Sequence, residues 1–264
     1  MQKIVRNLIF ILVFLAGCSR PPEPQQEGNI VVLLYHRIVD GAATNVYERS
    51  IADFKEDLKY LNENKIKVIG FEDLDDMLKK GAIPSSGAAI ITFDDGDHSW
   101  LTRALPLLKE YKMKATFFLW VSMIGRDSFL KWDEISVMSH YADEDGERPF
   151  SFGSHTMSHQ YLLNMKAAIN DQEEYNRYLD EEFGSSARII EDYSPDEVTA
   201  LSLPFGDGAG DEEIIDAAKR NGYRFIRTSE YGVMSSIWTD MYRIPCLTML
   251  DDTESKLIGE YLGI

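Results

Sequence analysis

The stretch "GAAIITFDDGDHSW", Gly87 to Trp100, carries the strongest indication of the fold class. Its apolar run, residues 88–93, is interrupted only by Thr92, which is typical of a strand buried on both faces. Two adjacent carboxylates, Asp94 and Asp95, follow at the point where such a strand ends. Because like charges this close are costly unless a cation takes up one of them, the stretch predicts either two solvated acids or a metal or base site.

Short continuous apolar runs alternate with helical periods from residue 30 onward, which is typical of a β/α architecture. Helices are predicted after the capping residue Ser50 and within residues 71–80 and 211–222. A length of 264 residues with 44% hydrophobic content suits one sizeable core, so we expect a single domain, large enough to be a catalytic domain, over residues 30–264. The predicted strands are residues 30–35, 88–93, 115–121, 150–154, 199–203 and 223–228.

Polar residues follow several of these strands, at the ends where the loops of a β/α fold converge. They include His36, the Asp94–Asp95 pair and His155. His155 and His159 in "SHTMSH" are spaced i and i+4, which predicts that both imidazoles lie on one face of a helical turn, within reach of one ion. Taken alone, the histidine pair fits a capped surface turn equally well. Together with the carboxylates, it predicts a site for a divalent metal with room for water.

The N-terminal segment predicts export and anchoring. Residues 1–17 place basic residues before an apolar run too short to span a bilayer, as in a secretory signal, although a short buried helix is the alternative. "LAGC", which ends at Cys18, resembles the lipobox of bacterial lipoproteins, and this resemblance implies a lipidated Cys18. Residues 18–29 then read as a flexible tether. We expect a membrane-anchored lipoprotein that faces the periplasm or the cell exterior.

Composition limits the partners of the chain. A net charge of −17 makes nucleic acid and anionic membrane surfaces poor partners, so membrane contact is expected through the lipid alone. Cys246 is the only cysteine beyond the N-terminal segment, which excludes an intramolecular disulfide after cleavage. We expect Cys246 to be a buried, inert thiol.

"TFDDG", followed some sixty residues later by "SHTMSH", resembles the first two motifs of the polysaccharide deacetylases, carbohydrate esterase family 4. "LLYHRI" (33–38), "LKWDEISVMS" (130–139) and "LSLPFGD" (201–207) are similar to the branch that de-N-acetylates exported poly-N-acetylglucosamine. The resemblance implies a distorted (β/α) barrel of about seven strands. It also implies an N-acetylated polysaccharide as substrate.

The resemblance assigns the metal and the base. Asp95, His155 and His159 would hold a divalent metal, with zinc expected and nickel, cobalt or iron(II) as alternatives. Asp94 would be the general base toward the metal-activated water that attacks the acetamide carbonyl. In this assignment one of the two adjacent carboxylates becomes a ligand and its neighbour a proton acceptor.

The resemblance also assigns roles around the substrate. His36 would be the general acid that protonates the leaving amine, and the backbone N–H of Phe205 would stabilise the oxyanion. Trp132 would stack on a sugar, or else belong to the core. Many family members carry an arginine shortly before the Pro-Tyr-Gly element that orients the base, whereas this chain has Ser202 and Leu203 there. Arg37 and Arg243 are the candidates for orienting the base.

Three other functions stay open at this point. The substrate could be peptidoglycan, or the chain could be a non-catalytic glycan-binding lipoprotein on the same scaffold. A binder needs no base beside its metal, so retention of Asp94 argues for an enzyme. A two-histidine-one-carboxylate oxygenase usually has its carboxylate two residues after the first histidine, and Thr156-Met157 offers none.

Overall fold

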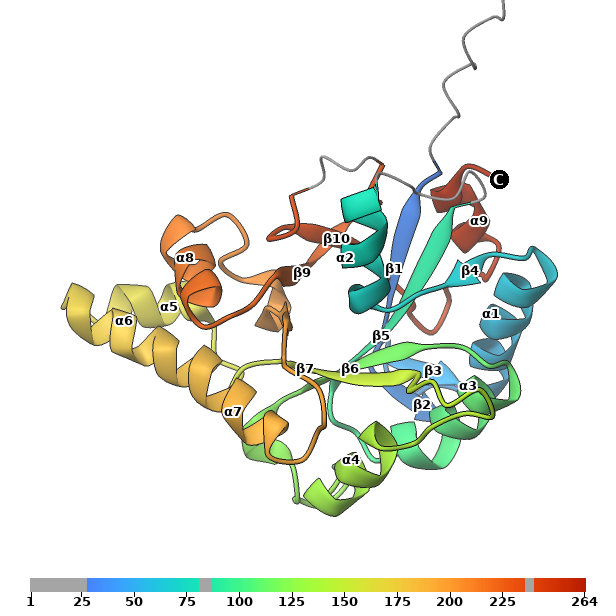
Figure 1. The fold of residues 1–264 in the computed structure, drawn as a ribbon, viewed down its shortest axis with the longest axis horizontal. Helices are drawn as coiled ribbons and strands as arrows, with labels where there is room; N and C mark the ends of the chain where they lie inside the picture. The colour runs from blue at the N-terminus through green and yellow to red at the C-terminus, as the bar shows by residue number, and fades with distance from the viewer. Residues whose placement is uncertain (1–27, 81–86, 236–239) are drawn as a thin grey trace, which may run out of the picture.

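The structure, a computed structural model, describes residues 28–80, 87–235 and 240–264. Its centre is a closed ring of seven parallel strands, with helices packed around it (Figure 1). Around the ring the order is β1, β10, β9, β8, β7, β6, β5, and β5 pairs with β1 again. The predicted (β/α) barrel is therefore confirmed. The ring consists of β1 (Ile30–Tyr35), β5 (Ala88–Asp95), β6 (Ala115–Leu119), β7 (Phe150–Ser154), β8 (Ala200–Ser202), β9 (Phe225–Tyr231) and β10 (Ile244–Thr248).

Three short strands lie outside the ring. β4 (Lys67–Val68) pairs only with β5. β2 (Arg37–Val39) and β3 (Glu48–Ser50) pair with each other in a separate two-stranded sheet. Since β2 begins two residues after the end of β1, this small sheet lies at the C-terminal end of β1.

The helices begin where the sequence places capping residues. The Ser50 hydroxyl accepts a hydrogen bond from the backbone N–H of Asp53 at 3.0 Å, and Asp211 caps its helix in the same way. The helices are α1 (Ile51–Glu63), α2 (Phe71–Lys80), α3 (Leu105–Glu110), α4 (Trp132–Ser139), α5 (Leu162–Ala168), α6 (Gln172–Asp180), α7 (Ser186–Glu191), α8 (Glu212–Arg220) and α9 (Leu257–Leu262), with the short turns η1 (Trp100–Ala104), η2 (Val121–Met123), η3 (Glu181–Ser185) and η4 (Pro204–Gly206).

Side chains along the ring strands alternate between the helix layer and the barrel interior. Leu33 and Ile91 belong to the cluster that packs against the helices, whereas Leu34 and Ile90 belong to a second cluster, inside the ring. All four are buried. Both faces of each strand are thus covered, which explains why the strands read as continuous apolar runs.

The strand β10 was not predicted from the sequence. It contains Pro245, which has no N–H to donate and therefore weakens a strand pattern. The pairing register between β10 and β9 shifts between Ile244 and Cys246, so the proline lies at an irregularity in the ladder. Cys246 itself is buried and unpaired, which confirms the prediction of a buried free thiol.

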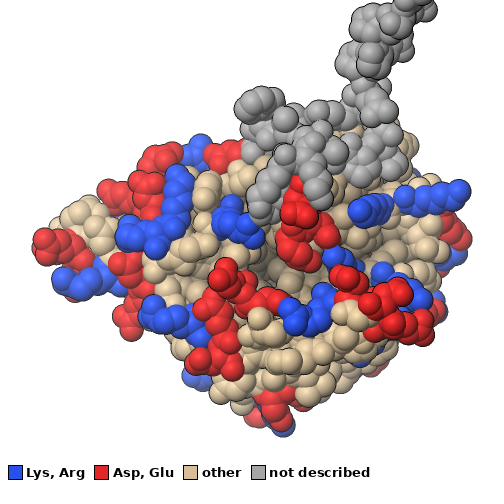
Figure 2. Space-filling model, viewed as in Figure 1, with Lys and Arg blue, Asp and Glu red and all other residues tan. Residues whose placement is uncertain are grey.

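The N-terminal predictions, the signal over residues 1–17 and the lipidated Cys18, lie outside the described residues. Among the helices that the structure does describe, none is long and apolar enough to cross a membrane. The face shown in Figure 2 carries acidic and basic side chains intermixed, and no large, uniformly basic area is visible on it.

Candidate functional site

Several polar side chains lie together at the C-terminal end of the barrel. Each lies an even number of residues after an interior apolar residue of its strand, so it points to the same side of the strand, toward the barrel interior. Asp94, Ser202 and Arg227 each come an even number of residues after an interior apolar residue of β5, β8 and β9, respectively. All three are buried. His36 continues the interior parity of β1 just beyond its end. The alternation of the strands therefore directs these four side chains toward one centre.

A cavity of about 680 Å³ opens at this end of the barrel. It falls within the size range of small-molecule sites. The predicted catalytic and metal-binding residues all line it, namely His36, Asp94, Asp95, His155, His159 and Phe205.

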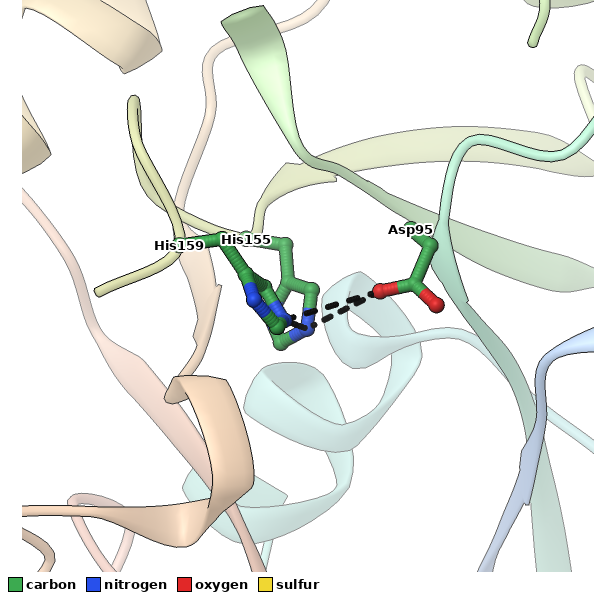
Figure 3. A group of neighbouring side chains, drawn as sticks. All are labelled: Asp95, His155 and His159. Carbon is green, nitrogen blue, oxygen red and sulfur yellow. Dashed lines mark hydrogen bonds and ion pairs between the residues drawn. The ribbon is translucent and has the colours of Figure 1, made fainter. Parts of the chain in front are cut away.

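Asp95, His155 and His159 form a compact group of three potential metal ligands within the described residues (Figure 3). The two imidazole Nε2 atoms are 3.0 Å apart, and Asp95 Oδ1 lies 3.5 Å and 3.6 Å from the Nε2 atoms of His155 and His159. As Figure 3 shows, the carboxylate comes from the end of β5 and points toward the two rings. One ion could contact all three side chains.

The loop that carries the two histidines is not helical, so the predicted helical turn is wrong. Residues 155–161 contain a bend at 157–158 and neither helix nor strand, and Thr156 and His159 both have positive φ, 64° and 57°. These left-handed residues reverse the chain and bring the two rings together without a helix. Asp95, with φ of 90°, lies in the same unusual region. Backbone of this kind is costly for residues other than glycine and tends to collect at functional sites.

The protonation of the ligand group suits a cation. The backbone carbonyl of Ser202 lies 2.8 Å from His155 Nδ1 and can only accept a hydrogen bond, so Nδ1 carries the proton and Nε2 presents a lone pair. Burial lowers the pKa of His155 to about 3, which keeps the ring neutral. Burial and the charge on Asp94 raise the pKa of Asp95 to about 7. A cation between these groups would offset that cost, and two imidazoles with one carboxylate suit a divalent transition metal.

Asp94 is a buried carboxylate with one oxygen held and one free. Arg227 pairs with Oδ2, and the Ser202 hydroxyl donates to the same oxygen at 3.0 Å. Burial alone would raise the pKa of Asp94, but Arg227, with His155 and His36, lowers it to about 2. Oδ1 is buried and has no hydrogen-bond partner among the described residues. An ionised carboxylate with one unpartnered oxygen, on a residue that lines the cavity, is suited to act as a general base.

His36 lies at the edge of the cavity, beside the ring of Tyr47, with 5.0 Å between ring centroids. The indole N–H of Trp100 donates to the His36 backbone carbonyl at 2.6 Å, which fixes the backbone position. Burial lowers the pKa of His36, and the charge on Asp94 opposes this change. His36 is therefore close enough to Asp94 for the charge of the carboxylate to affect the pKa of the imidazole.

Phe205 and Trp132 are placed differently. Phe205 lies in the turn η4 with φ of 59° and lines the cavity, and its ring meets the His159 ring edge-on, with 4.7 Å between the ring centroids. Trp132 begins α4, stacks on Tyr193 at 4.8 Å and is not among the residues that line the cavity. Trp132 is partly buried against the hydrophobic core, which agrees with the alternative of a core residue rather than with sugar stacking at the cavity.

Arg227 is the residue that the sequence analysis missed. The arginines considered there are occupied elsewhere: Arg37 pairs with Glu48 and Asp97, and Arg243 pairs with Glu212. A detectable signal existed, because Arg227 lies two residues after Phe225 and so occupies an inward position of an apolar strand. A charged residue at such a position needs a buried partner.

Known proteins are similar to this chain in sequence and in fold. The Bacillus subtilis protein YxkH, whose name assigns it provisionally to the polysaccharide deacetylases, is 27% identical over 90% of this chain and 77% of its own length. The poly-beta-1,6-N-acetyl-D-glucosamine N-deacetylase of Staphylococcus epidermidis is 26% identical over 82% of this chain and 73% of its own. The solved structure of IcaB from Ammonifex degensii matches with a TM-score of 0.72 at 19% identity, over 90% of this chain and 99% of that one, which shows the same fold.

The family assignment rests on a sequence profile described as polysaccharide deacetylase, which matches residues 82–226. This segment runs from before β5 into β9 and contains the three potential metal ligands and Asp94. Because the match covers more than half of the sequence, the chain belongs to the polysaccharide deacetylase family.

Proposed function

We propose that this polysaccharide deacetylase removes N-acetyl groups from an N-acetylhexosamine polymer of the poly-N-acetylglucosamine type, outside the cytoplasm and with the help of a divalent metal. The observation that carries the proposal is the Asp94 carboxylate, which has one oxygen fixed and one free beside three potential ligands. The relatives named for poly-beta-1,6-N-acetyl-D-glucosamine support the choice of substrate.

Asp95, His155 and His159 would hold the metal, with zinc as the expected ion. When bound, the metal supplies Lewis acidity, which lowers the pKa of water and polarises the acetamide carbonyl. The three side chains offer one carboxylate oxygen and two Nε2 atoms, and the Ser202 carbonyl keeps the His155 ring in the required orientation.

The remaining steps belong to this chain's own groups. Oδ1 of Asp94 accepts a proton from the attacking water while the oxygen of that water bonds to the carbonyl carbon. Arg227 and Ser202 meanwhile keep Oδ2 of Asp94 in place. The backbone N–H of Phe205 donates to the carbonyl oxygen as negative charge develops there. His36 donates a proton to the nitrogen as the C–N bond breaks, which releases acetate and a free amine.

The test is a direct assay of both products. Purified protein is incubated with fully N-acetylated β-1,6-glucosamine oligomers, peptidoglycan fragments and O-acetylated xylan, and acetate and primary amine are measured with and without a chelator. We expect equal amounts of acetate and amine from the β-1,6 oligomers, and loss of both with the chelator. Product formation unaffected by exhaustive chelation would contradict metal dependence, and release only from peptidoglycan would replace the proposed substrate.

The metal group can be tested by removing one ligand. His159→Ala should weaken zinc binding at least tenfold and lower deacetylation in parallel, because two remaining ligands hold an ion poorly. His98→Ala is the matched control, since His98 pairs with Glu134 at 3.2 Å and does not line the cavity. Zinc content is measured by elemental analysis after dialysis. Full zinc occupancy in His159→Ala would remove His159 from the proposed site.

The general acid predicts a pH dependence. His36 must be protonated to act, so the rate should fall as the pH rises through the pKa of His36, which burial lowers below 6.5 in the free protein. His36→Ala should retain its metal, lose about 10²-fold in rate, and lack this alkaline limb in its pH–rate profile. The expected loss is at the low end of the usual range because His36 is only partly buried. A profile unchanged in His36→Ala would return His36 to a structural role.

Extracytoplasmic location rests on the sequence "LAGC". Cys18→Ser should leave the expressed precursor without an acyl group, so that the protein moves from the detergent phase to the aqueous phase. Intact mass and detergent partitioning of both proteins report the change. Wild-type protein that lacks the acyl mass and partitions into the aqueous phase would contradict the anchoring proposal.

A further inference from the structure

The loop that carries His155 and His159 depends on its surroundings for its shape. It belongs to no helix or strand, so its backbone N–H groups need partners outside the regular hydrogen-bond ladders. Positive φ at Thr156 and His159 adds to the cost, and backbone of this kind persists only where neighbouring groups hold it. The residues that hold this loop therefore set the distance between the two imidazoles.

Part of the support comes from the motif itself. The Ser154 hydroxyl accepts a hydrogen bond from the backbone N–H of Thr156 at 3.0 Å. The Thr156 hydroxyl accepts one from the backbone N–H of His159, also at 3.0 Å. The N–H groups of Met157 and Ser158, in the middle of the loop, have their partners in another part of the chain.

Glu182 is the partner of both residues in the middle of the loop. Its backbone carbonyl accepts a hydrogen bond from the N–H of Met157 at 3.2 Å. Its carboxylate accepts two from Ser158, one from the backbone N–H at 2.9 Å and one from the hydroxyl at 2.6 Å. Each carboxylate oxygen thus has a donor, and hydrogen bonds to a charged acceptor are stronger than those between neutral groups.

The burial of Glu182 is explained by these contacts. The residue lies in η3, a π-helical turn between α6 and α7, and it is only 4% exposed. A carboxylate is costly to bury without donors, and within the described residues both hydrogen bonds to this carboxylate come from Ser158. Glu182 is not among the residues that line the cavity, so it contacts the loop and not the space where a substrate would lie.

A second turn, η2, contacts the same loop through neutral backbone groups. The N–H of Val121 donates to the Thr156 carbonyl at 3.2 Å, and the N–H of Ser122 donates to the Met157 carbonyl at 3.0 Å. The loop is therefore held by both η2 and η3. Among these contacts of the described residues, the Glu182 carboxylate is the charged one.

From these contacts we propose that Glu182 is a positioning residue, whose carboxylate holds Ser158 and thereby keeps His155 and His159 in a metal-binding arrangement before any metal binds. The inference rests on the proposed function, in which the two histidines hold the ion. It adds a residue outside the cavity that acts on the reaction only through the loop. Loss of an outer partner of a metal site usually lowers metal affinity about 10- to 100-fold.

The first experiment measures the loop without metal or substrate. Hydrogen–deuterium exchange of the metal-free protein is followed by mass spectrometry on peptides that cover residues 155–161 and, for comparison, β5. Glu182→Ala should raise the exchange rate of the loop about tenfold, which is the usual effect of one lost hydrogen bond to a charged group, and should leave β5 unchanged. Unchanged exchange in the loop, or an equal increase in β5, would overturn the inference.

The second experiment uses the metal alone. Competition with a chelator of known affinity should show that Glu182→Ala binds Zn²⁺ about tenfold more weakly than the wild type. Glu182→Gln keeps one acceptor oxygen and should recover part of this affinity. The visible absorption of bound Co²⁺ depends on the arrangement of its ligands, so it should also change in Glu182→Ala. Wild-type zinc affinity in Glu182→Ala would overturn the inference.

Glu191 provides the matched control. It ends α7, and its carboxylate accepts a hydrogen bond from the backbone N–H of Val198 at 2.9 Å, in a loop without a proposed metal ligand. Glu191→Ala removes the same kind of contact elsewhere and should change neither zinc affinity nor exchange in residues 155–161. Ser158→Ala removes only one of the two donors and should have a smaller effect than Glu182→Ala. Equal losses of zinc affinity in Glu191→Ala and Glu182→Ala would contradict a specific role of Glu182.

Kinetic constants keep this inference distinct from the proposed function. With zinc at saturation, Glu182→Ala should lower kcat about three- to tenfold and leave KM within about twofold, because Glu182 does not line the cavity. A change confined to KM would contradict a role through the metal ligands. Absence of deacetylation in the wild type would reject the proposed function, whereas the exchange and zinc measurements would still test the role of Glu182.

Discussion

Asp94→Asn should lower the rate of deacetylation by about 10⁴-fold and leave the metal content unchanged. The size follows the upper end of the range for a general base, because Asp94 is buried and no other described carboxylate shares its position against Arg227 and Ser202. An amide at this position keeps the shape of the side chain but cannot take the proton of water. The metal should stay, since Asp95, His155 and His159 are all retained.

Asp97→Asn is the matched control for this variant. Asp97 lines the same cavity and also faces an arginine, Arg37, at 3.4 Å, but its side chain is partly exposed. Asp97→Asn should lower the rate of deacetylation by less than a tenth of the fold-decrease expected for Asp94→Asn. Both variants are assayed below the onset of unfolding, with zinc content measured on the same samples. Turnover of Asp94→Asn within tenfold of the wild type would mean that another group accepts the proton.

Arg227→Met should destabilise the folded protein by about 3–5 kcal/mol. Arg227 and Asp94 are a buried ion pair, and removal of one partner leaves the other charge buried and uncompensated. Activity should fall as well, because Oδ2 of Asp94 loses its charged donor. Arg227→Lys keeps the charge without the planar shape and should recover part of the stability. Denaturant unfolding of each variant gives the free energy of unfolding.

Two further variants make the stability result specific. Arg243→Met removes an arginine whose ion pair with Glu212 is largely exposed, and it should cost less than about 1 kcal/mol. The double variant Arg227→Met with Asp94→Asn leaves neither charge behind, so it should be more stable than Arg227→Met alone. If Arg227→Met unfolds at the same denaturant concentration as Arg243→Met, the pair does not stabilise the barrel.

The sequence predicted those parts of the site that lie on regular strands. Asp94 and Asp95 are the last residues of β5 and His36 follows β1. Both strands have continuous apolar runs, and parallel strands bring their C-terminal ends to one side of the sheet by geometry alone. The pairing of His155 with His159 was also anticipated, but its cause was not. Left-handed backbone at Thr156 and His159 produces it, and nothing local in "SHTMSH" indicates positive φ at a threonine or a histidine.

Arg227 escaped the sequence analysis for a different reason. Its partner is on another strand, distant in the sequence, so only the three-dimensional pairing of β8 with β9 and the closure of the ring bring it to Asp94. The expected motif position is occupied by Ser202 and Leu203, at the end of β8, whereas the arginine lies on the neighbouring strand β9. Ser202 nevertheless contacts both members of the pair, so the hydroxyl and the guanidinium together surround the carboxylate oxygen.

The closed ring has a consequence for how the chain folds. β1 pairs with both β5 and β10, so the first and last ring strands of the sequence must meet before every ring strand has a partner on both edges. Contacts this distant in sequence are slow to form, and an unclosed barrel exposes apolar strand edges that favour aggregation. The segment 82–226 that carries the family profile lacks both β1 and β10. Expressed alone, it should be an aggregation-prone fragment rather than a minimal enzyme.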